Sequence, residues 1–246
     1  MILASAVGLV GSVHASEGST LIAVASSVMP VAEALKSKLQ SETEADIQLA
    51  GGATGTLFAQ ARLGAPYDAF IAADQTYLDR LGHQGAVVAN SRVTYAVGRL
   101  VLVGRGELSL NRPIDPAALG APLRIALPNP KLAPYGVAAR EALVRLDAFI
   151  PVRYKTALGT NVGQTFALVH SGNAQLGLVA LSTVLGTPLG EGLRYEVVPR
   201  DWHSDVRHDA AILLHGKSNP LARLFLELLV SESGRAVLGS HGYEPP

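Results

Sequence analysis

Small, hydroxyl-bearing and glycine residues stand at four points of this sequence where a helix is expected to begin. These stretches are residues 25–27, 51–56, 133–137 and 160–164. The first backbone N–H groups of a helix have no partner within it, and a helix start carries about half a positive charge. Such positions bind anions, and nearby hydroxyls supply further hydrogen-bond donors. The four stretches therefore predict a site for one small oxyanion.

The stretch Ala133-Pro134-Tyr135-Gly136 is the most distinctive of the four. Proline suits the first turn of a helix because its missing N–H would have had no partner there. Tyr135 can donate a phenolic hydrogen bond while its ring shields a ligand from water. We expect this stretch to open a helix over residues 138–149.

Each stretch also has a simpler interpretation. Ser26 or Ser27 could cap the helix that follows, which is the commoner role for a serine in that position. The glycine-rich residues 51–56 could form a tight turn capped by a threonine. They lack the Gly-Lys-Ser/Thr ending of a nucleotide-binding loop, so nucleotide hydrolysis is not expected.

Other polar residues are expected to have structural roles. Asp74 stands just before a predicted helix and is expected to cap it rather than to act as a base. His203, Asp205 and His208 are residue types that can bind a metal ion. Their spacing does not match a known ligand pattern, so we expect them to lie in a polar, solvent-exposed connection. The sequence has no cysteine and no Gly-X-Ser-X-Gly motif, so we expect neither a metal site nor an enzyme nucleophile.

Strand-like and helix-like segments alternate along the chain, which is typical of an α/β protein with parallel strands and crossover helices. We expect two doubly wound α/β lobes. The predicted strands are 21–25, 47–50, 70–72, 123–127, 154–158, 176–181, 195–198 and 210–214. The predicted helices are 28–41, 55–63, 75–83, 138–149, 163–171 and a last one beginning near residue 219.

Two extended segments are expected to cross between the lobes. The first is residues 95–104, where Gly98 would let the chain bend between two sheets. The second is the polar stretch 200–209. This layout places lobe I at residues 17–97 plus 205–246 and lobe II at residues 98–204, with the crossings acting as a hinge.

The overall charge and the first residues bear on location. Twenty basic residues balance twenty acidic ones, so the protein has no overall positive charge that would attract nucleic acid or an anionic membrane.

Residues 1–16 are small and apolar, and Val13-His14-Ala15 resembles a signal-peptidase site, although the usual basic residue is missing. We expect a signal-peptide remnant and an exported, periplasmic protein. A disordered hydrophobic tail is the alternative.

Several stretches together resemble the molybdate-binding proteins of bacterial ABC importers, in the type II periplasmic binding-protein superfamily. The resemblance runs from about residue 20 to residue 243. The stretches that carry it are GGATGTLFAQ (51–60), GAPYDAFIAADQ (64–75), TYAVGRLVL (94–102), NP and APYG (129–136), NVGQ (161–164) and GLVALS (177–182).

The resemblance implies a ligand set at the four predicted helix starts. The anion ligands of that family fall on the hydroxyls of Ser26, Ser27, Thr54 and Tyr135 and on the backbone N–H of Val162. It leaves open which of the two serines contacts the anion. It implies that molybdenum is held through its oxygens, with no direct bond between metal and protein and no other cofactor.

One position departs from part of the family. Some members place a tyrosine on the strand that corresponds to residues 178–181, whereas this chain has Ala180. The chain therefore resembles the branch that takes its tyrosine from the 133–136 loop. The implied function is capture of molybdate, and of tungstate, by a monomer that delivers the anion to a membrane permease.

Three rival functions share parts of this pattern. A sulfate- or phosphate-binding protein would use the same physical chemistry. An enzyme acting on a phosphorylated substrate would need an acid, a base or a nucleophile at the helix starts, and none stands out. The effector domain of a transcription regulator shares the two-lobed fold but would need an attached helix-turn-helix, for which we expect no room before residue 20.

Overall fold

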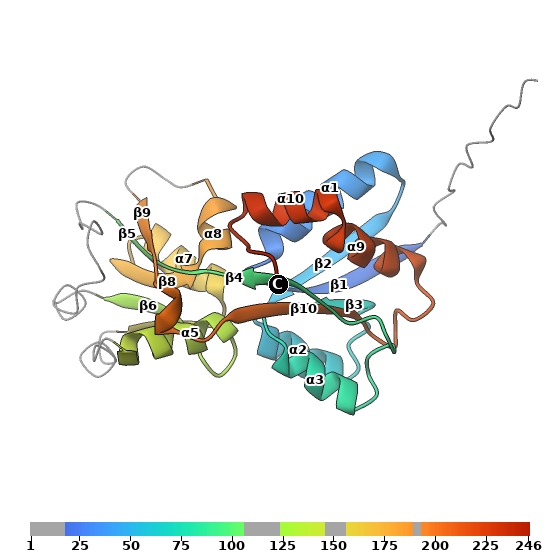
Figure 1. Cartoon of the computed structure of the whole chain (residues 1–246), viewed down its shortest axis with the longest axis horizontal. Coiled ribbons are helices and arrows are strands. Elements are labelled where there is room, and N and C mark those ends of the chain that lie inside the picture. The colour runs from blue at the N-terminus through green and yellow to red at the C-terminus, as the bar shows by residue number, and fades with distance from the viewer. Residues whose placement is uncertain (1–17, 106–123, 146–155, 189–192) are drawn as a thin grey trace, which may run out of the picture.

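The computed structural model describes residues 18–105, 124–145, 156–188 and 193–246. Within these ranges the chain forms two five-stranded mixed sheets, each covered by helices on both faces (Figure 1). The predicted α/β fold with two lobes is confirmed. The expected signal segment 1–16 lies outside the described residues. No helix in the described ranges is long and apolar enough to cross a membrane.

The first sheet has the strand order β2-β1-β3-β10-β4. Strand β1 runs parallel to β2 and β3, whereas β10 is antiparallel to both of its neighbours. Helices α1, α9 and α10 cover one face, and α2 and α3 cover the other (Figure 1). The bounds are β1 Ser19–Ala25, α1 Met29–Glu42, β2 Asp46–Gly52, α2 Thr54–Arg62, β3 Ala69–Ile71, α3 Thr76–His83, β4 Val93–Gly98, β10 Val206–Ile212, α9 Pro220–Val230 and α10 Glu232–Ser240.

The second sheet has the order β7-β6-β8-β5-β9, with β5 antiparallel to β8 and β9. Helix α5 lies on one face and α7 on the other (Figure 1). The bounds are β5 Leu100–Arg105, β6 Ile125–Pro128, α5 Pro134–Arg145, β7 Thr156–Gly159, α7 Val162–His170, β8 Leu176–Ala180, α8 Leu181–Leu185 and β9 Leu193–Val197.

The chain crosses between the sheets where the sequence predicted it. β4 ends in the first sheet at Gly98, and β5 begins in the second sheet at Leu100, so that Arg99 alone separates them. The return runs from β9 through a short 3-10 helix, Arg200–Trp202, to β10. The residue bounds predicted for the two lobes remain a prediction.

Gly98 is needed for a different reason from the one predicted. Its backbone is not in the left-handed region, so bending is not what requires glycine. A Cβ at this position would overlap the Tyr135 hydroxyl and lie 2.7 Å from Cε1 of His208. The crossing strand therefore passes so close to Tyr135 that no side chain fits.

Four details differ from the predicted elements. Both sheets are mixed rather than parallel, because the crossing strands enter antiparallel to their neighbours. The last predicted helix is two helices, separated at Ser231, which caps α10 by accepting a hydrogen bond from Gly234 N–H. α8 was not predicted. The predicted helix 138–149 begins earlier, at Pro134, and residues 146–149 lie outside the described ranges.

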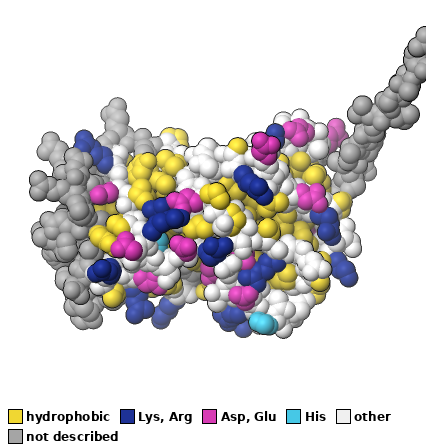
Figure 2. All heavy atoms as spheres, in the orientation of Figure 1, with side chains coloured by type: hydrophobic (Ala, Val, Ile, Leu, Met, Phe, Trp, Pro, Cys, Tyr) yellow, Lys and Arg dark blue, Asp and Glu magenta, His cyan; other side chains and the backbone are white. Residues whose placement is uncertain are grey.

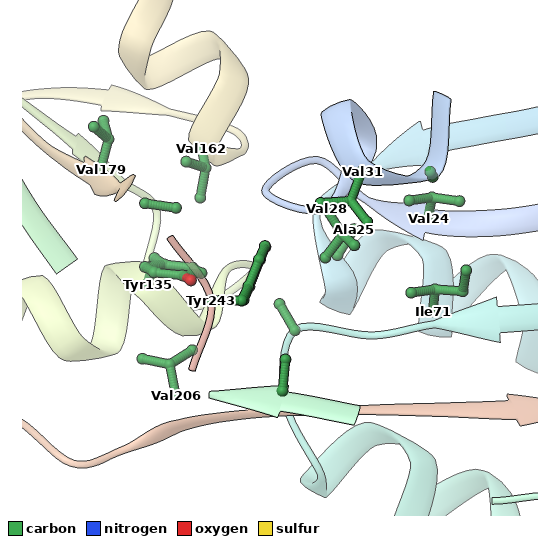
Figure 3. Close-up of a cluster of buried hydrophobic side chains, with 14 of the residues drawn as sticks. Val24, Ala25, Val28, Val31, Ile71, Tyr135, Val162, Val179, Val206 and Tyr243 are labelled. Atoms are coloured by element: carbon green, nitrogen blue, oxygen red, sulfur yellow. The ribbon is translucent and has the colours of Figure 1, made fainter. Parts of the chain in front are cut away.

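The largest cluster of buried apolar side chains contains residues of both sheets and of the C-terminal tail. Tyr135, Val206 and Tyr243 belong to it together with Val24 and Ile71 of the first sheet. Figure 3 shows members of this cluster on elements of both lobes. The core therefore continues from one lobe into the other.

Candidate functional site

The predicted helix starts from the two lobes face each other. In Figure 3, Val162 and Tyr135 of the second lobe lie across from Ala25 and Val28 of the first. A Cβ placed on Gly163 would lie 3.9 Å from Cβ of Ser26. The structure thus brings the first and fourth predicted stretches together where the two lobes meet.

The two serines do not cap the helix that follows them. Helix α1 begins after Val28 with no side-chain capping hydrogen bond, so the common structural role predicted as an alternative is wrong. Ser27 is almost fully buried, and its Oγ has no hydrogen-bond partner among the described residues. An unpartnered buried hydroxyl is costly, which fits a group kept for a ligand.

The second stretch is built differently from the expected glycine loop. Gly51 and Gly52 lie in β2, and a Cβ on Gly51 would lie 2.5 Å from Cε of Met29. Thr54 is the first residue of α2, and its buried Oγ1 accepts a hydrogen bond from Ala73 N–H at 3.3 Å. The alternative of a threonine cap is therefore wrong here too, and the Thr54 hydroxyl keeps its hydrogen to donate.

The α2 start also touches the opposite lobe directly. The N–H of Gly55 donates to the carbonyl of Leu132 at 2.9 Å. Leu132 stands just before Tyr135, so this bond joins the second and third predicted stretches. The N–H of Ser26 also donates to the carbonyl of Gly52 at 2.8 Å, which joins the first stretch to the second. The four stretches thus lie near one another where the two lobes meet.

Tyr135 is the second residue of α5 and is 1% exposed. Its hydroxyl has no hydrogen-bond partner of regular geometry among the described residues. Burial, and then the neighbouring Tyr243 hydroxyl, raise the pKa of Tyr135 well above its usual value. The phenol therefore stays protonated and can act as a donor.

Val162 opens α7, and its side chain is buried. The preceding Asn161 caps the helix by accepting a hydrogen bond from Gln164 N–H at 2.8 Å. The N–H of Val162, at the first helical position, has no partner within the helix. It is therefore available to a ligand, and its contact with an anion remains a prediction.

The predicted ligand set contains only neutral groups. Ser26, Ser27, Thr54, Tyr135 and the N–H of Val162 supply donors, and none of these side chains carries a charge at neutral pH. Such a set suits an anion that has no proton of its own to donate, because every contact is a donor.

The comparisons with known proteins agree with this geometry. The family model for bacterial extracellular solute-binding proteins matches residues 20–244. This chain belongs to that family. Molybdate-binding protein ModA of Azotobacter vinelandii is 34% identical over 90% of this chain and 88% of its own length. The corresponding protein of Rhodobacter capsulatus is 30% identical over 98% of this chain and 93% of its own.

Solved structures show the same relationship for this solute-binding protein. The periplasmic molybdate-binding protein of Azotobacter vinelandii superposes with a TM-score of 0.85 at 26% identity, covering 92% of this chain and 99% of that one. The sulfate-binding protein SubI of Mycobacterium tuberculosis has a TM-score of 0.75 at 13% identity, covering 92% and 86%. SubI shares only the fold. The resemblance to molybdate-binding proteins is confirmed, and the relatives are binding proteins rather than enzymes.

Asp74 of the solute-binding protein has the structural role that the sequence predicted. Its Oδ1 accepts a hydrogen bond from Tyr77 N–H at 3.2 Å at the start of α3. Asp74 lines a cavity of about 270 Å³ between the lobes. Burial raises the pKa of this carboxyl to about 6.

The solvent-exposed role predicted for His208 is wrong. His208 and Asp209 lie in β10, in the interior of the first sheet, and are at most 1% exposed. Asp209 is compensated by Arg92, whose Nε lies 2.6 Å from Oδ2. No group of three or more metal-ligating side chains occurs among the described residues.

Sequence reasoning missed two groups that hold the first loop. The hydroxyls of Ser182 and Tyr243 both donate to the Ser27 carbonyl, at 2.7 and 2.9 Å. Ser182 stands in a stretch that carried the family resemblance, but Tyr243 had no local signal. Its contact with Ser27 spans 216 residues.

Buried His208 gives the solute-binding protein a pH-dependent stability. Burial lowers the pKa of His208 to about 4, against 6.5. The unfolded chain therefore takes up a proton first as the pH falls, and stability is lost between about pH 6.5 and pH 4, by up to about 3 kcal/mol.

Urea unfolding at pH 7.5, 6 and 4.5 tests this expectation. The free energy of unfolding should fall less with decreasing pH in His208→Gln than in the wild-type protein. The carboxylates contribute equally to the pH dependence of the two proteins. Parallel curves for the two proteins would mean that His208 does not titrate in this range.

Proposed function

We propose that this protein captures molybdate, and tungstate with it, between its two lobes and delivers it to the permease of an ABC importer. The relatives named molybdate-binding protein cover nearly the whole chain, which supports this ligand class. Membership of the extracellular solute-binding family supports a location outside the cytoplasm. A periplasmic location and a monomeric state are part of the proposal.

The observation that carries the proposal is the pair of buried hydroxyls at the interlobe site that lack a regular hydrogen-bond partner. Ser27 and Tyr135 come from opposite lobes. The Ser27 hydroxyl has no partner among the described residues, and the Tyr135 hydroxyl has only the neighbouring Tyr243 hydroxyl, without regular hydrogen-bond geometry. A bound oxyanion would accept a hydrogen bond from each and remove the cost of leaving them unpaired.

Molybdate suits this donor set because it is fully deprotonated at neutral pH. Each helix start contributes about half a positive charge, so α2, α5 and α7 together can offset most of the charge of a dianion without a buried lysine or arginine. Sulfate has the same charge and shape, so discrimination must come from the size of the cavity. We propose that closure about the crossing strands sets that size.

The surface supports a small-ligand role rather than nucleic-acid binding. In Figure 2, basic and acidic side chains are interspersed over the face shown, with no broad basic area. This distribution agrees with the equal totals of twenty basic and twenty acidic residues. The anion is therefore attracted by the local site and not by the field of the whole molecule.

A thermal-shift panel tests the proposed ligand. Molybdate and tungstate at about 100 times their dissociation constant should stabilise the protein by about 2.7 kcal/mol, or by about 5–10 °C. Sulfate, phosphate and chromate at the same concentration should give no comparable shift. A shift with sulfate or phosphate alone would favour the rival oxyanion, and no shift with any anion would contradict the proposal.

A further inference from the structure

The C-terminal tail after α10 is tied to both crossing segments. Glu244 and Val97 exchange two backbone hydrogen bonds, each of 2.9 Å, at the end of β4. The Glu244 carboxylate also pairs with Arg99, at 2.6 Å, and with Arg200. Arg99 and Arg200 belong to the outgoing and the return crossing. The tail therefore has a fixed position at the hinge (Figure 1).

This anchoring carries the side chain of Tyr243 into the interlobe core. Tyr243 is 6% exposed, and its hydroxyl donates to the Ser27 carbonyl at 2.9 Å. The Ser182 hydroxyl donates to the same oxygen from the second lobe. Both lone pairs of the carbonyl are thus occupied by groups from outside its own loop.

Tyr243 also lies beside the predicted phenolic donor. Tyr135 and Tyr243 both meet the His208 ring edge-on, with centroid distances of 5.9 and 5.1 Å. Figure 3 shows the two tyrosines next to each other. Burial raises the pKa of Tyr243 to about 12, so its hydroxyl keeps the proton that it donates.

We propose that Tyr243 is a positioning residue of the anion site, whose hydroxyl fixes the Ser27 loop and packs beside Tyr135. This inference rests on the proposed function. A carbonyl oxygen turned towards a fully deprotonated anion would repel it. By holding the Ser27 carbonyl, Tyr243 leaves only donors of that loop facing the ligand.

Among the described residues, no other tyrosine hydroxyl donates to the Ser27 carbonyl. β8 ends at Ala180, which brings no hydroxyl to the first loop. The tail therefore supplies the second tyrosine, and preorganising the loop lowers the ordering cost of binding.

The test compares Tyr243→Phe with Tyr95→Phe in the full chain, by calorimetric titration with molybdate and by thermal unfolding without ligand. Tyr95 is a matched control, because it is also buried, contacts His208 edge-on and donates one hydrogen bond, to Ala72 at 3.2 Å. Tyr243→Phe should weaken molybdate binding about 3- to 10-fold, the range for one lost hydrogen bond, whereas Tyr95→Phe should stay within about 2-fold of wild type.

The outcomes separate the two proposals. Equal molybdate affinity for wild type and Tyr243→Phe, with only a lower melting temperature for the variant, would mean a purely structural role and overturn the inference. Equal losses of affinity in both variants would overturn it as well. A wild-type protein that binds no oxyanion would instead overturn the proposed function, and the inference with it.

Discussion

Tyr135→Phe is expected to weaken molybdate binding by about 1.5–3 kcal/mol, or roughly ten- to a hundred-fold, the loss for one hydrogen bond to a charged group. The same substitution should raise the melting temperature of the ligand-free protein. The Tyr135 hydroxyl is buried without a regular partner among the described residues, and removing such a group relieves a cost of about 1–3 kcal/mol. Weaker ligand binding together with higher ligand-free stability is the result expected for a residue whose hydroxyl serves the ligand and not the fold.

Calorimetric titration and thermal unfolding of the same preparations measure both effects. Tyr195→Phe is the control, because Tyr195 is an exposed residue of β9 in the second lobe, and neither quantity should change. Unchanged affinity in Tyr135→Phe would remove Tyr135 from the site. A fall in the ligand-free melting temperature would mean that its hydroxyl has a structural partner.

Gly98→Ala is expected to lower molybdate affinity more than about tenfold and to destabilise the protein by about 1–3 kcal/mol, the usual cost of overpacking. The new Cβ would overlap the Tyr135 hydroxyl and lie 2.9 Å from its Cζ. Either the crossing strand or the phenol must move. Since the strand is paired with β10 on one side, we expect the phenol to be displaced.

A double-mutant cycle checks this mechanism. In a Tyr135→Phe background the oxygen is gone, so Gly98→Ala should cost less stability than it does in wild type. Gly82→Ala in α3 is the matched control, because a Cβ there meets nothing within 4 Å. Additive effects of Gly98→Ala and Tyr135→Phe would show that the two residues do not interact.

The helix starts of the site were predictable because their signals are local. Hydroxyls and glycines follow apolar strand segments within a few residues, and parallel strands bring such ends to one edge of a sheet. That is why Ser27, Thr54, Tyr135 and Val162 lie where the two lobes meet. Their contact with molybdate remains a prediction.

Residues whose roles depend on distant partners were missed or misjudged. His208 stands in a polar run, which indicated solvent, yet β10 lies between β3 and β4. Burial of its neighbour Asp209 is possible only because Arg92 and Gln75 reach it from other elements. The hydrogen bond from Tyr243 to Ser27 joins residues 216 positions apart. Local pattern carries no information about such pairings.

The placement of β10 bears on the order in which the molecule can fold. The strands of the second sheet follow one another without interruption between Leu100 and Val197, whereas the first sheet needs β10 from beyond them. Pairing β10 with β3 closes a loop that contains the whole second lobe, and long loops make contacts form slowly. The second lobe can therefore fold as an inserted unit before β10 pairs with β3 and β4 and completes the first sheet.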